Sequence, residues 1–378
     1  MRNNNYNSGE LHVGKGSKNR YASSSFVDDV KKSSIAVVAS MLVLTIITCV
    51  FFAAFGDFDT SMPAGNFPLS STTTTTTTDN AKPLEPDSSK NPYATITDKT
   101  NFIASKGGDN LSDVYLYSEY AILIRLSDMT TIAHQNADTK MYPASMTKVM
   151  TVVTALDLIE DLEDEYTITS EVLSAVPSDA STAWLKDFIG SKATVRDLLY
   201  GISYRSGGDS VICLLDYLGL TMKEFATLMN EKAIEIGLQN TTFGGAIGMD
   251  EEENQTTCRD MAAIMAYAME NPLCQDLFGG AAYRLKYIEM TYYNATLVNT
   301  LDNMGTKPSY VLGRNYTLLG AKSGLEENAG YCLVSYIQND VTGETFVLVT
   351  ANATRAGEYP YNKNPILDMQ ILFEEFNP

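Results

Sequence analysis

The sequence predicts an α+β domain, in which strands from the two ends of the folded part enclose a helical lobe. Near the start of this part, residues 121–124 form an apolar run of strand length. Near its end, the runs 331–337 and 345–351 flank a turn at 339–343, a pattern typical of a β-hairpin. Apolar residues at helical spacing follow over 366–376. We therefore expect one sheet that joins both ends of the folded part.

Capping residues indicate the helices of the inserted lobe. Thr194 precedes a helical run at 195–200, and Gly201 behind that run is typical of a helix end. Thr221 and Glu224 have the spacing of a capping box, in which each side chain satisfies a backbone N–H at the start of the next helix. The middle of the folded part is therefore expected to be mainly helical.

Composition and charge exclude several classes of function. The chain has 378 residues, and 46 Asp and Glu against 27 Lys and Arg give a formal net charge of -19. This excess of acid argues against a nucleic acid partner, because phosphate binding needs clustered Lys and Arg. The two histidines, His12 and His134, exclude a multi-histidine zinc site and any Ser-His-Asp triad not built on one of them. Five widely spaced cysteines form no Cys-x-x-Cys pair, so we expect no metal and no cofactor.

The N-terminal region predicts a membrane anchor. Residues 1–33 form a tail with six basic and three acidic residues, whereas 34–56 carry no charge and are almost wholly apolar. At about 1.5 Å per residue this segment is long enough to cross a bilayer as a helix. The positive-inside rule then places the tail in the cytoplasm and the rest of the chain outside. A cleaved signal peptide is the alternative, but its apolar stretch is usually only about 7–15 residues long.

A linker is expected over residues 57–100. Thr, Ser and Pro dominate this segment, and residues 72–78 are an unbroken run of Thr. Such a composition cannot bury enough apolar surface to offset the entropy of ordering the chain. We expect a disordered tether that connects the membrane to a catalytic domain over 101–378.

Ser145-x-x-Lys148 is the one Ser-x-x-Lys motif in the chain. Pro143 marks the start of a helix, and the apolar run 149–156 predicts that this helix is buried. The spacing puts the hydroxyl and the amine on one face of the first turn, where burial lowers a lysine pKa. A neutral lysine can take the proton of a serine nucleophile. The alternative interpretation is that Ser145 caps the helix and Lys148 is a solvated lysine.

Two further short motifs follow at a distance. A Ser-Gly-Gly at 206–208 comes after the predicted helix, and a Lys-Ser-Gly at 322–324 ends a predicted strand. Each is weak alone, because glycine commonly marks turns and bulges. Together with Ser-x-x-Lys and in this order, they form the motif set of penicillin-binding proteins and class A β-lactamases.

The sequence around these motifs resembles the serine-type D-alanyl-D-alanine carboxypeptidases, the low-molecular-mass penicillin-binding proteins. The stretches that carry the resemblance are 142–148, 194–201, 260–262 and 329–334. The resemblance implies a β-lactamase/transpeptidase-like α/β/α sandwich, with a mostly antiparallel sheet covered by helices and a site between the sheet and the helical lobe. It also implies peptidoglycan stem peptides ending in D-Ala-D-Ala as substrates and β-lactam antibiotics as inhibitors.

The resemblance assigns catalytic roles to three residues. Ser145 would be the nucleophile that forms an acyl-enzyme, and Lys148 the base that takes its proton and later helps to activate the deacylating water. Ser206 would pass a proton to the leaving D-alanine.

The resemblance also assigns residues to substrate binding. Lys322 would place positive charge near the substrate carboxylate and hold down the pKa of Lys148, while Ser323 would offer its hydroxyl to that carboxylate. Gly324 would keep the strand edge open, and the N–H groups of Leu325 and the nucleophile would form the oxyanion hole. Arg355, after the last strand, is a further candidate for the carboxylate, with a solvated loop arginine as the alternative.

The chain departs from the family pattern at several positions. Gly208 stands where the family usually has Asn, and Ser323 where it usually has Thr. The stretch 243–248 departs from the usual Asn-Pro-x-Gly pattern. Loss of the Asn amide at the substrate-binding position 208 is expected to lower turnover by about 10²–10³-fold. Trp184, the single tryptophan, can either cover the cleft or pack inside, and we favour packing.

These observations favour a penicillin-sensitive D,D-carboxypeptidase in the bacterial cell membrane, with its catalytic domain outside the cytoplasm. One alternative is a low-turnover protein that binds penicillin or stem peptides. Another is a D,D-endopeptidase or transpeptidase acting on cross-links. A class A β-lactamase is disfavoured, because the Glu-x-x-Leu-Asn motif that carries its deacylating glutamate is absent.

Overall fold

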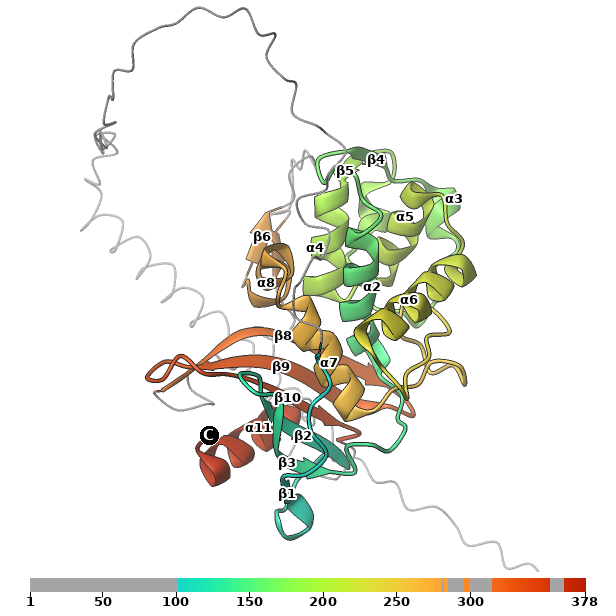
Figure 1. The fold of residues 1–378 in the computed structure, drawn as a ribbon. Coiled ribbons are helices and arrows are strands. Elements are labelled where there is room, and N and C mark those ends of the chain that lie inside the picture. The colour runs from blue at the N-terminus through green and yellow to red at the C-terminus, as the bar shows by residue number, and fades with distance from the viewer. Residues whose placement is uncertain (1–100, 281, 285–295, 299–314, 354–363) are drawn as a thin grey trace, which may run out of the picture. The chain divides into compact units, whose positions relative to one another are not determined.

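The structure is a computed structural model, and it describes residues 101–280, 282–284, 296–298, 315–353 and 364–378 (Figure 1). The predicted cytoplasmic tail, membrane span and linker, at 1–33, 34–56 and 57–100, lie outside the described residues. Among the helices within the described ranges, none is long and apolar enough to cross a membrane.

A six-stranded sheet forms the base of the domain, and its strand order is β1-β3-β2-β10-β9-β8. The strands are β1 (Asp109–Asn110), β2 (Tyr120–Arg125), β3 (Thr130–Gln135), β8 (Tyr316–Glu326), β9 (Gly330–Asn339) and β10 (Thr345–Ala351). All pairs are antiparallel except β1 with β3. Because β2 pairs with β10, the sheet joins the two ends of the domain, as predicted. The predicted hairpin is β9–β10.

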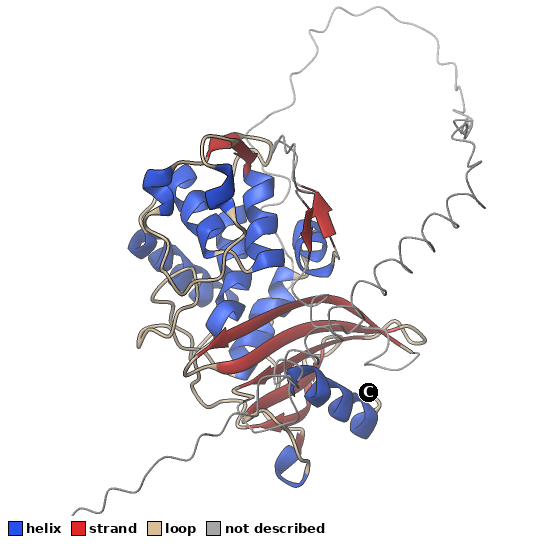
Figure 2. Ribbon diagram, turned by 180° about the vertical axis from the view of Figure 1, so that it is seen from behind, coloured by secondary structure: helices blue, strands red, loops and turns tan. Residues whose placement is uncertain are grey.

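The sheet has helices on both faces (Figure 2). In β10, Val347 and Val349 belong to the larger core under the helical lobe, whereas Phe346 and Leu348 belong to a second core. Residues of α11 (Asn364–Phe376) complete that second core on the opposite face. Successive side chains of a strand point to opposite faces, so a strand buried on both sides is apolar throughout. The expected α/β/α sandwich is confirmed.

The helical lobe lies between β3 and β8 in the sequence (Figure 1). Its described helices are α2 (Thr147–Leu156), α3 (Ser170–Leu173), α4 (Val195–Arg205), α5 (Gly208–Leu218), α6 (Met222–Ile236), α7 (Cys258–Ala268) and α8 (Pro272–Gly279). The lobe also has the short 3₁₀ segments η2 (Ala144–Met146) and η3 (Leu185–Phe188), whereas η1 (Leu111–Asp113) precedes β2. Two small two-stranded sheets pair β4 (Glu165–Thr167) with β5 (Lys192–Thr194) and β6 (Ala282–Arg284) with β7 (Thr296–Val298).

The predicted helix starts are confirmed, but the predicted end of α4 is wrong. Thr194 caps α4 and Thr221 forms its capping box with Glu224. Gly201 does not end α4, which continues to Arg205. A side chain at position 201 would lie 2.1 Å from Ser210 Oγ, so this glycine permits close packing of α4 against α5.

Candidate active site

Ser145 lies in η2, immediately before α2. Its side chain is 8% exposed, and the preceding Ala144 has a φ of 47°, an unfavourable value for a residue with a Cβ. The Nζ atom of Lys148 is 2.8 Å from Ser145 Oγ, as the one-turn spacing predicts. Every residue of α2 is buried, as its sequence indicates.

Lys148 is 1% exposed, so the interpretation of a solvated lysine is wrong. Its Nζ also donates to the carbonyl oxygen of Ile247 at 2.5 Å. Burial lowers the pKa of Lys148 to about 7, although the charges of Glu326 and Asp209 act in the opposite direction. Near neutral pH a large share of this amine is therefore uncharged, and an uncharged amine can accept the proton of the neighbouring hydroxyl.

Ser206 occupies the C-terminal end of α4 in a left-handed conformation, with a φ of 56°. This turn redirects the chain into α5. Ser206 is also nearly buried, and its Oγ accepts a hydrogen bond of 3.0 Å from Lys322 Nζ. The fold thus brings together two residues separated by 116 positions.

Lys322 lies in β8, the edge strand of the sheet, and is 1% exposed. Its Nζ donates a second hydrogen bond, of 2.7 Å, to the carbonyl of Ser323. Burial and the nearby charge of Lys148 hold the pKa of Lys322 well below its usual range. Lys322 is expected from its motif to depress the pKa of Lys148. In the structure the dominant cause at Lys148 is its own burial.

Gly324 allows β8 to approach η2. A Cβ at this position would lie 2.9 Å from the Cβ of Ala144 and 3.1 Å from the backbone nitrogen of Ser145. The backbone of β8 therefore passes directly beside the N–H of Ser145. Leu325 follows with its side chain largely exposed, and Ser323 is half-buried.

Gly208 begins α5 and lies against Ile247. A Cβ on Gly208 would be 3.0 Å from the Cβ of Ala180 and 3.4 Å from Cγ2 of Ile247. The N–H of Gly208 donates to the carbonyl of Ser181 at 2.7 Å. An asparagine at this position would therefore require a small shift of the 180–181 loop.

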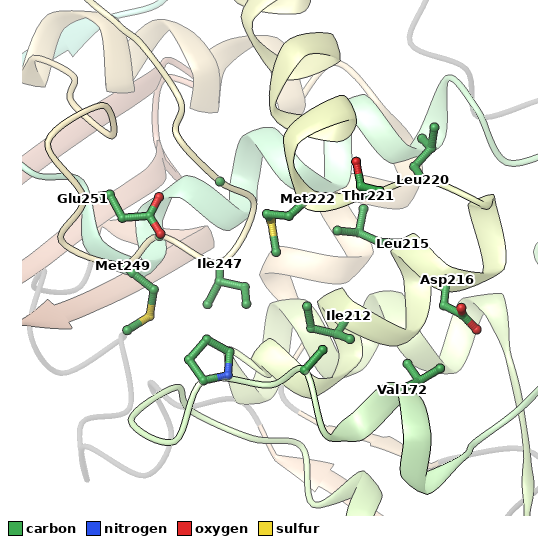
Figure 3. Close-up of a pocket in the computed structure, with 14 residues that line it drawn as sticks. Val172, Ile212, Leu215, Asp216, Leu220, Thr221, Met222, Ile247, Met249 and Glu251 are labelled. Carbon is green, nitrogen blue, oxygen red and sulfur yellow. The ribbon is translucent and has the colours of Figure 1, made fainter.

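A pocket of about 440 Å³ lies on the other side of Ile247 (Figure 3). Its mainly apolar lining includes Val172, Ile212, Leu215, Met222, Ile247 and Met249. The side chain of Ile247 lines this pocket, while its carbonyl binds the ammonium of Lys148. The pocket therefore shares a wall with the Ser145–Lys148 pair.

The comparisons with known proteins agree with this geometry. A family model described as D-alanyl-D-alanine carboxypeptidase matches residues 110–354. The chain belongs to this family. The matched range includes both Ser–Lys pairs, and the six-stranded sheet with its helical lobe is the expected fold.

Three relatives show how similar the chain is to other proteins of the D-alanyl-D-alanine carboxypeptidase family. DacF of Bacillus subtilis is 28% identical over 248 residues, which are 64% of this chain and 59% of DacF. DacC of Escherichia coli is 31% identical over 221 residues, or 57% of this chain and 52% of DacC. The crystal structure of the Streptomyces K15 DD-transpeptidase has a TM-score of 0.59 and 26% identity, covering 70% of this chain and 98% of that one. The chain thus spans only a little over half the length of the first two relatives.

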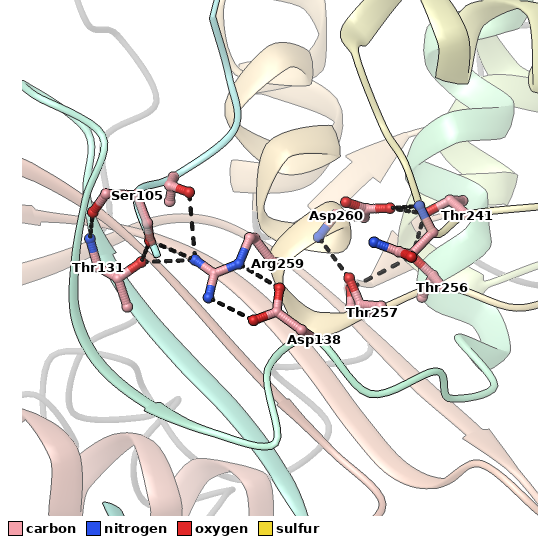
Figure 4. A network of polar contacts seen from close by, with 10 residues as sticks. Ser105, Thr131, Asp138, Thr241, Thr256, Thr257, Arg259 and Asp260 are labelled. Carbon is pink, nitrogen blue, oxygen red and sulfur yellow. Dashed lines mark hydrogen bonds and ion pairs between the residues drawn. The ribbon is translucent and has the colours of Figure 1, made fainter. Parts of the chain in front are cut away.

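A polar network around Arg259 holds the segment that leads to Ser145 (Figure 4). Arg259 of α7 is buried and forms two hydrogen bonds with Asp138, of 2.7 and 3.0 Å. Its Nη1 also reaches Thr131 Oγ1 of β3 at 2.9 Å. Arg259 lowers the pKa of Asp138. The backbone of Met141 pairs with that of Thr256, just before α7. The segment that enters η2 is therefore held at Asp138 and again at Met141.

Some contributing groups were not identified from the sequence. The Ile247 carbonyl is a backbone group, which a side-chain pattern cannot reveal. Gly248, with a φ of +84°, lies against the carbonyl of Ala144, and the unusual stretch 243–248 was the one available signal. Trp184 is 47% exposed, so the prediction that it packs inside is wrong. Arg355 lies outside the described residues.

Proposed function

We propose that this protein is a serine D,D-carboxypeptidase that removes the terminal D-alanine from peptidoglycan stem pentapeptides. The observation that carries the proposal is the pair of buried contacts, Lys148 Nζ with Ser145 Oγ at 2.8 Å and Lys322 Nζ with Ser206 Oγ at 3.0 Å. Membership of the D-alanyl-D-alanine carboxypeptidase family supports the same substrate class.

In the acylation step, uncharged Lys148 accepts the proton of Ser145, and Oγ attacks the carbonyl carbon of the penultimate D-alanine. The oxygen of the tetrahedral intermediate takes the negative charge, and the N–H groups of Ser145 and Leu325 stabilise it. The carbon–nitrogen bond then breaks. Ser206 delivers a proton to the nitrogen and regains one from protonated Lys148, so that free D-alanine leaves and Lys148 is uncharged again.

In the deacylation step, Lys148 accepts a proton from water, and the resulting hydroxide attacks the ester carbon. The ester bond to Oγ breaks, and the proton returns to Ser145. Lys322 and Ser323 bind the C-terminal carboxylate of the substrate, and Arg355 is an additional candidate for that contact. A β-lactam is attacked at its amide carbonyl in the same way and leaves a covalent adduct on Ser145.

Gly208 and the relatives make a second function worth testing. The Streptomyces K15 relative bears both names, D-alanyl-D-alanine carboxypeptidase and DD-transpeptidase. Transfer of the acyl group to an amine requires the same residues and differs only in the acceptor. Because Gly208 replaces the usual Asn, another alternative is a low-turnover protein that is acylated but hydrolyses its acyl-enzyme slowly.

The cellular arrangement is also part of the proposal. The uncharged segment 34–56 anchors the chain in the bacterial membrane, with the basic tail 1–33 in the cytoplasm. The Thr-rich linker 57–100 then connects to the catalytic domain, 101–378, on the side of the membrane where peptidoglycan lies.

The test uses the full chain purified in detergent. We expect covalent labelling by a fluorescent penicillin and release of D-alanine from a stem pentapeptide, with both lost in Ser145→Ala. Ser127→Ala, at an exposed turn outside the site, is the matched control. Labelling without release favours the low-turnover alternative, and release that produces a new peptide bond when an amine is added favours transpeptidation. Labelling that persists in Ser145→Ala would contradict the mechanism.

A further inference from the structure

Arg205 immediately precedes Ser206 and stacks on Trp184. The guanidinium carbon of Arg205 is 4.1 Å from the centre of the Trp184 ring, a cation–π contact. Trp184 belongs to a loop that runs beside the turn at 206–208, because a Cβ on Gly207 would lie 3.0 Å from Ala183. The Arg205–Trp184 pair therefore lies next to the turn that carries Ser206.

The structure holds Trp184 in an exposed and unfavourable conformation. Its φ and ψ of 64° and 28° are left-handed, which is rare for a bulky residue. The residues before and after Trp184 are held by the buried carboxylate of Asp209, which accepts hydrogen bonds from the N–H of Ala183 at 2.8 Å and the N–H of Leu185 at 3.0 Å. An exposed aromatic ring held in this way is typical of a binding surface rather than of a core.

Arg205 has no acidic partner among the residues that the structure describes. Its Nε is buried and has no hydrogen-bond acceptor. Burial alone lowers the pKa of this guanidinium, and no carboxylate acts against it. Two other arginines of the lobe are different, since Arg196 pairs with Glu163 and Arg259 with Asp138. In a chain with a net charge of -19, an arginine left unpaired beside the active site indicates an anionic ligand.

We propose that Arg205, supported by Trp184, binds a stem-peptide carboxylate other than the C-terminal one and thereby sets substrate specificity. This inference rests on the proposed function. Lys322 and Ser323 already serve the C-terminal carboxylate, so Arg205 is left for a carboxylate farther from the scissile bond. Stem peptides offer two sources: the α-carboxylate of a γ-linked D-glutamyl residue, and the side-chain carboxylate of a diamino diacid at the third position. The planar guanidinium suits either group, because it can donate two parallel hydrogen bonds to a carboxylate.

The test measures peptide binding to the full chain carrying Ser145→Ala, which prevents turnover. Three synthetic stem pentapeptides are titrated by calorimetry: one with both internal carboxylates free, and two in which one or the other is a carboxamide. We expect one of the two amidations to weaken binding about tenfold, as for loss of a charge-assisted hydrogen bond. Trp184 is the only tryptophan, so its emission should change with the tightly bound peptides and report the contact directly.

Substitutions of Arg205 then decide the assignment. Arg205→Gln should remove the tenfold difference between free and amidated peptides, and Arg205→Lys should retain part of it. Arg196→Gln, on the same helix and already paired with Glu163, should leave the difference unchanged. Penicillin labelling of each variant with Ser145 restored shows that the site is folded.

Three results would overturn the inference. Two of them are equal affinity for all three peptides and a tenfold difference that survives Arg205→Gln. Absence of any peptide binding would also overturn it. Failure of the proposed function has a separate signature, namely no release of D-alanine by the chain with Ser145 intact, whatever the binding data show.

Discussion

The two serine–lysine pairs of the site make the same contact in different ways. Lys148 and Lys322 are both 1% exposed, and their Nζ atoms lie 2.8 and 3.0 Å from a serine hydroxyl. Ser145 and Lys148 are one helical turn apart, so local geometry brings them together. Ser206 and Lys322 are 116 positions apart and meet only when the helical lobe packs on the sheet. The first pair can therefore be specified by a short motif, whereas the second depends on the whole domain.

The electrostatics of the two lysines differ as well. Burial brings the pKa of Lys148 to about 7, where the amine exchanges protons at neutral pH. Lys322 is buried to the same extent and also experiences the charge of Lys148. Two adjacent buried ammonium groups are costly, so protonation of one opposes protonation of the other. We infer that Lys148 acts in proton transfer and that Lys322 acts mainly in positioning.

Removal of the Lys148 amine should have the largest effect. Lys148→Met keeps the length of the side chain but cannot accept the serine proton, so the rate of penicillin acylation is expected to fall by about 10³–10⁴-fold. The acylation rate is measured by quenching the reaction with a fluorescent penicillin at several time points and quantifying the labelled protein. Lys192→Met, in an exposed ion pair with Glu165, is the control and should react normally. A decrease of less than tenfold would exclude Lys148 as the base.

Removal of the second amine should cost less. Lys322→Met is expected to lower kcat/KM for D-alanine release by about 10²–10³-fold, because it removes one positioned hydrogen-bond donor from the substrate side of the site. The double variant with Ser206→Ala should be only slightly slower than Lys322→Met, since the two residues form one unit. Fully additive losses in that double-mutant cycle would mean that Ser206 and Lys322 act independently.

The pH dependence should distinguish the two pairs. Only neutral Lys148 accepts the serine proton, so the acylation rate should fall about tenfold per pH unit below about pH 7 and level off above it. Because burial of Lys148 is the dominant cause of its low pKa, Lys322→Met should only modestly raise the pH at which the acylation rate is half its maximum. A rate that is independent of pH between 5 and 8, in protein that remains folded, would contradict this assignment.

Stability should respond to the same titration. The folded-state pKa of Lys148 is below its ordinary value of 10.5, so between about pH 7 and 10.5 the unfolded chain binds more protons than the folded one. The free-energy cost of burying this amine therefore decreases, and stability rises, as pH increases through that window. Comparison of denaturant midpoints for Lys148→Met and the unsubstituted chain across the window isolates its contribution.

The smallest expected effect concerns Gly208. Gly208→Asn restores the amide usual in the family, but its Cβ must enter a space only 3.0 Å from Ala180. We expect D-alanine release to rise by about tenfold, which is less than the full value of a preorganised polar contact. Gly208→Ala introduces the same Cβ without the amide and should not increase release. Equal rates for the two variants would show that the amide has no role in this chain.

Several features could be predicted because they depend on neighbours in the sequence. Helix caps such as Thr194 and Thr221 act within one turn, and the apolar run of α2 implies burial whatever surrounds it. The end of α4 was mispredicted for the opposite reason. Gly201 is typical of a helix end by itself, but packing against Ser210 of α5 makes it an interior residue.

The sequence by itself determined the one-turn spacing of Ser145 and Lys148, the apolar runs that become strands buried on both faces, and the order of the three motifs. Only the tertiary structure decided that Lys148 is enclosed by the Ile247 carbonyl, 99 positions away, and that Lys322 reaches Ser206. It also decided that Trp184 lies exposed beneath an unpaired Arg205. Side-chain spacing along one helix or strand follows from backbone geometry. Desolvation of a charge depends on every segment that packs around it, so the pKa values that matter for catalysis exist only in the folded domain.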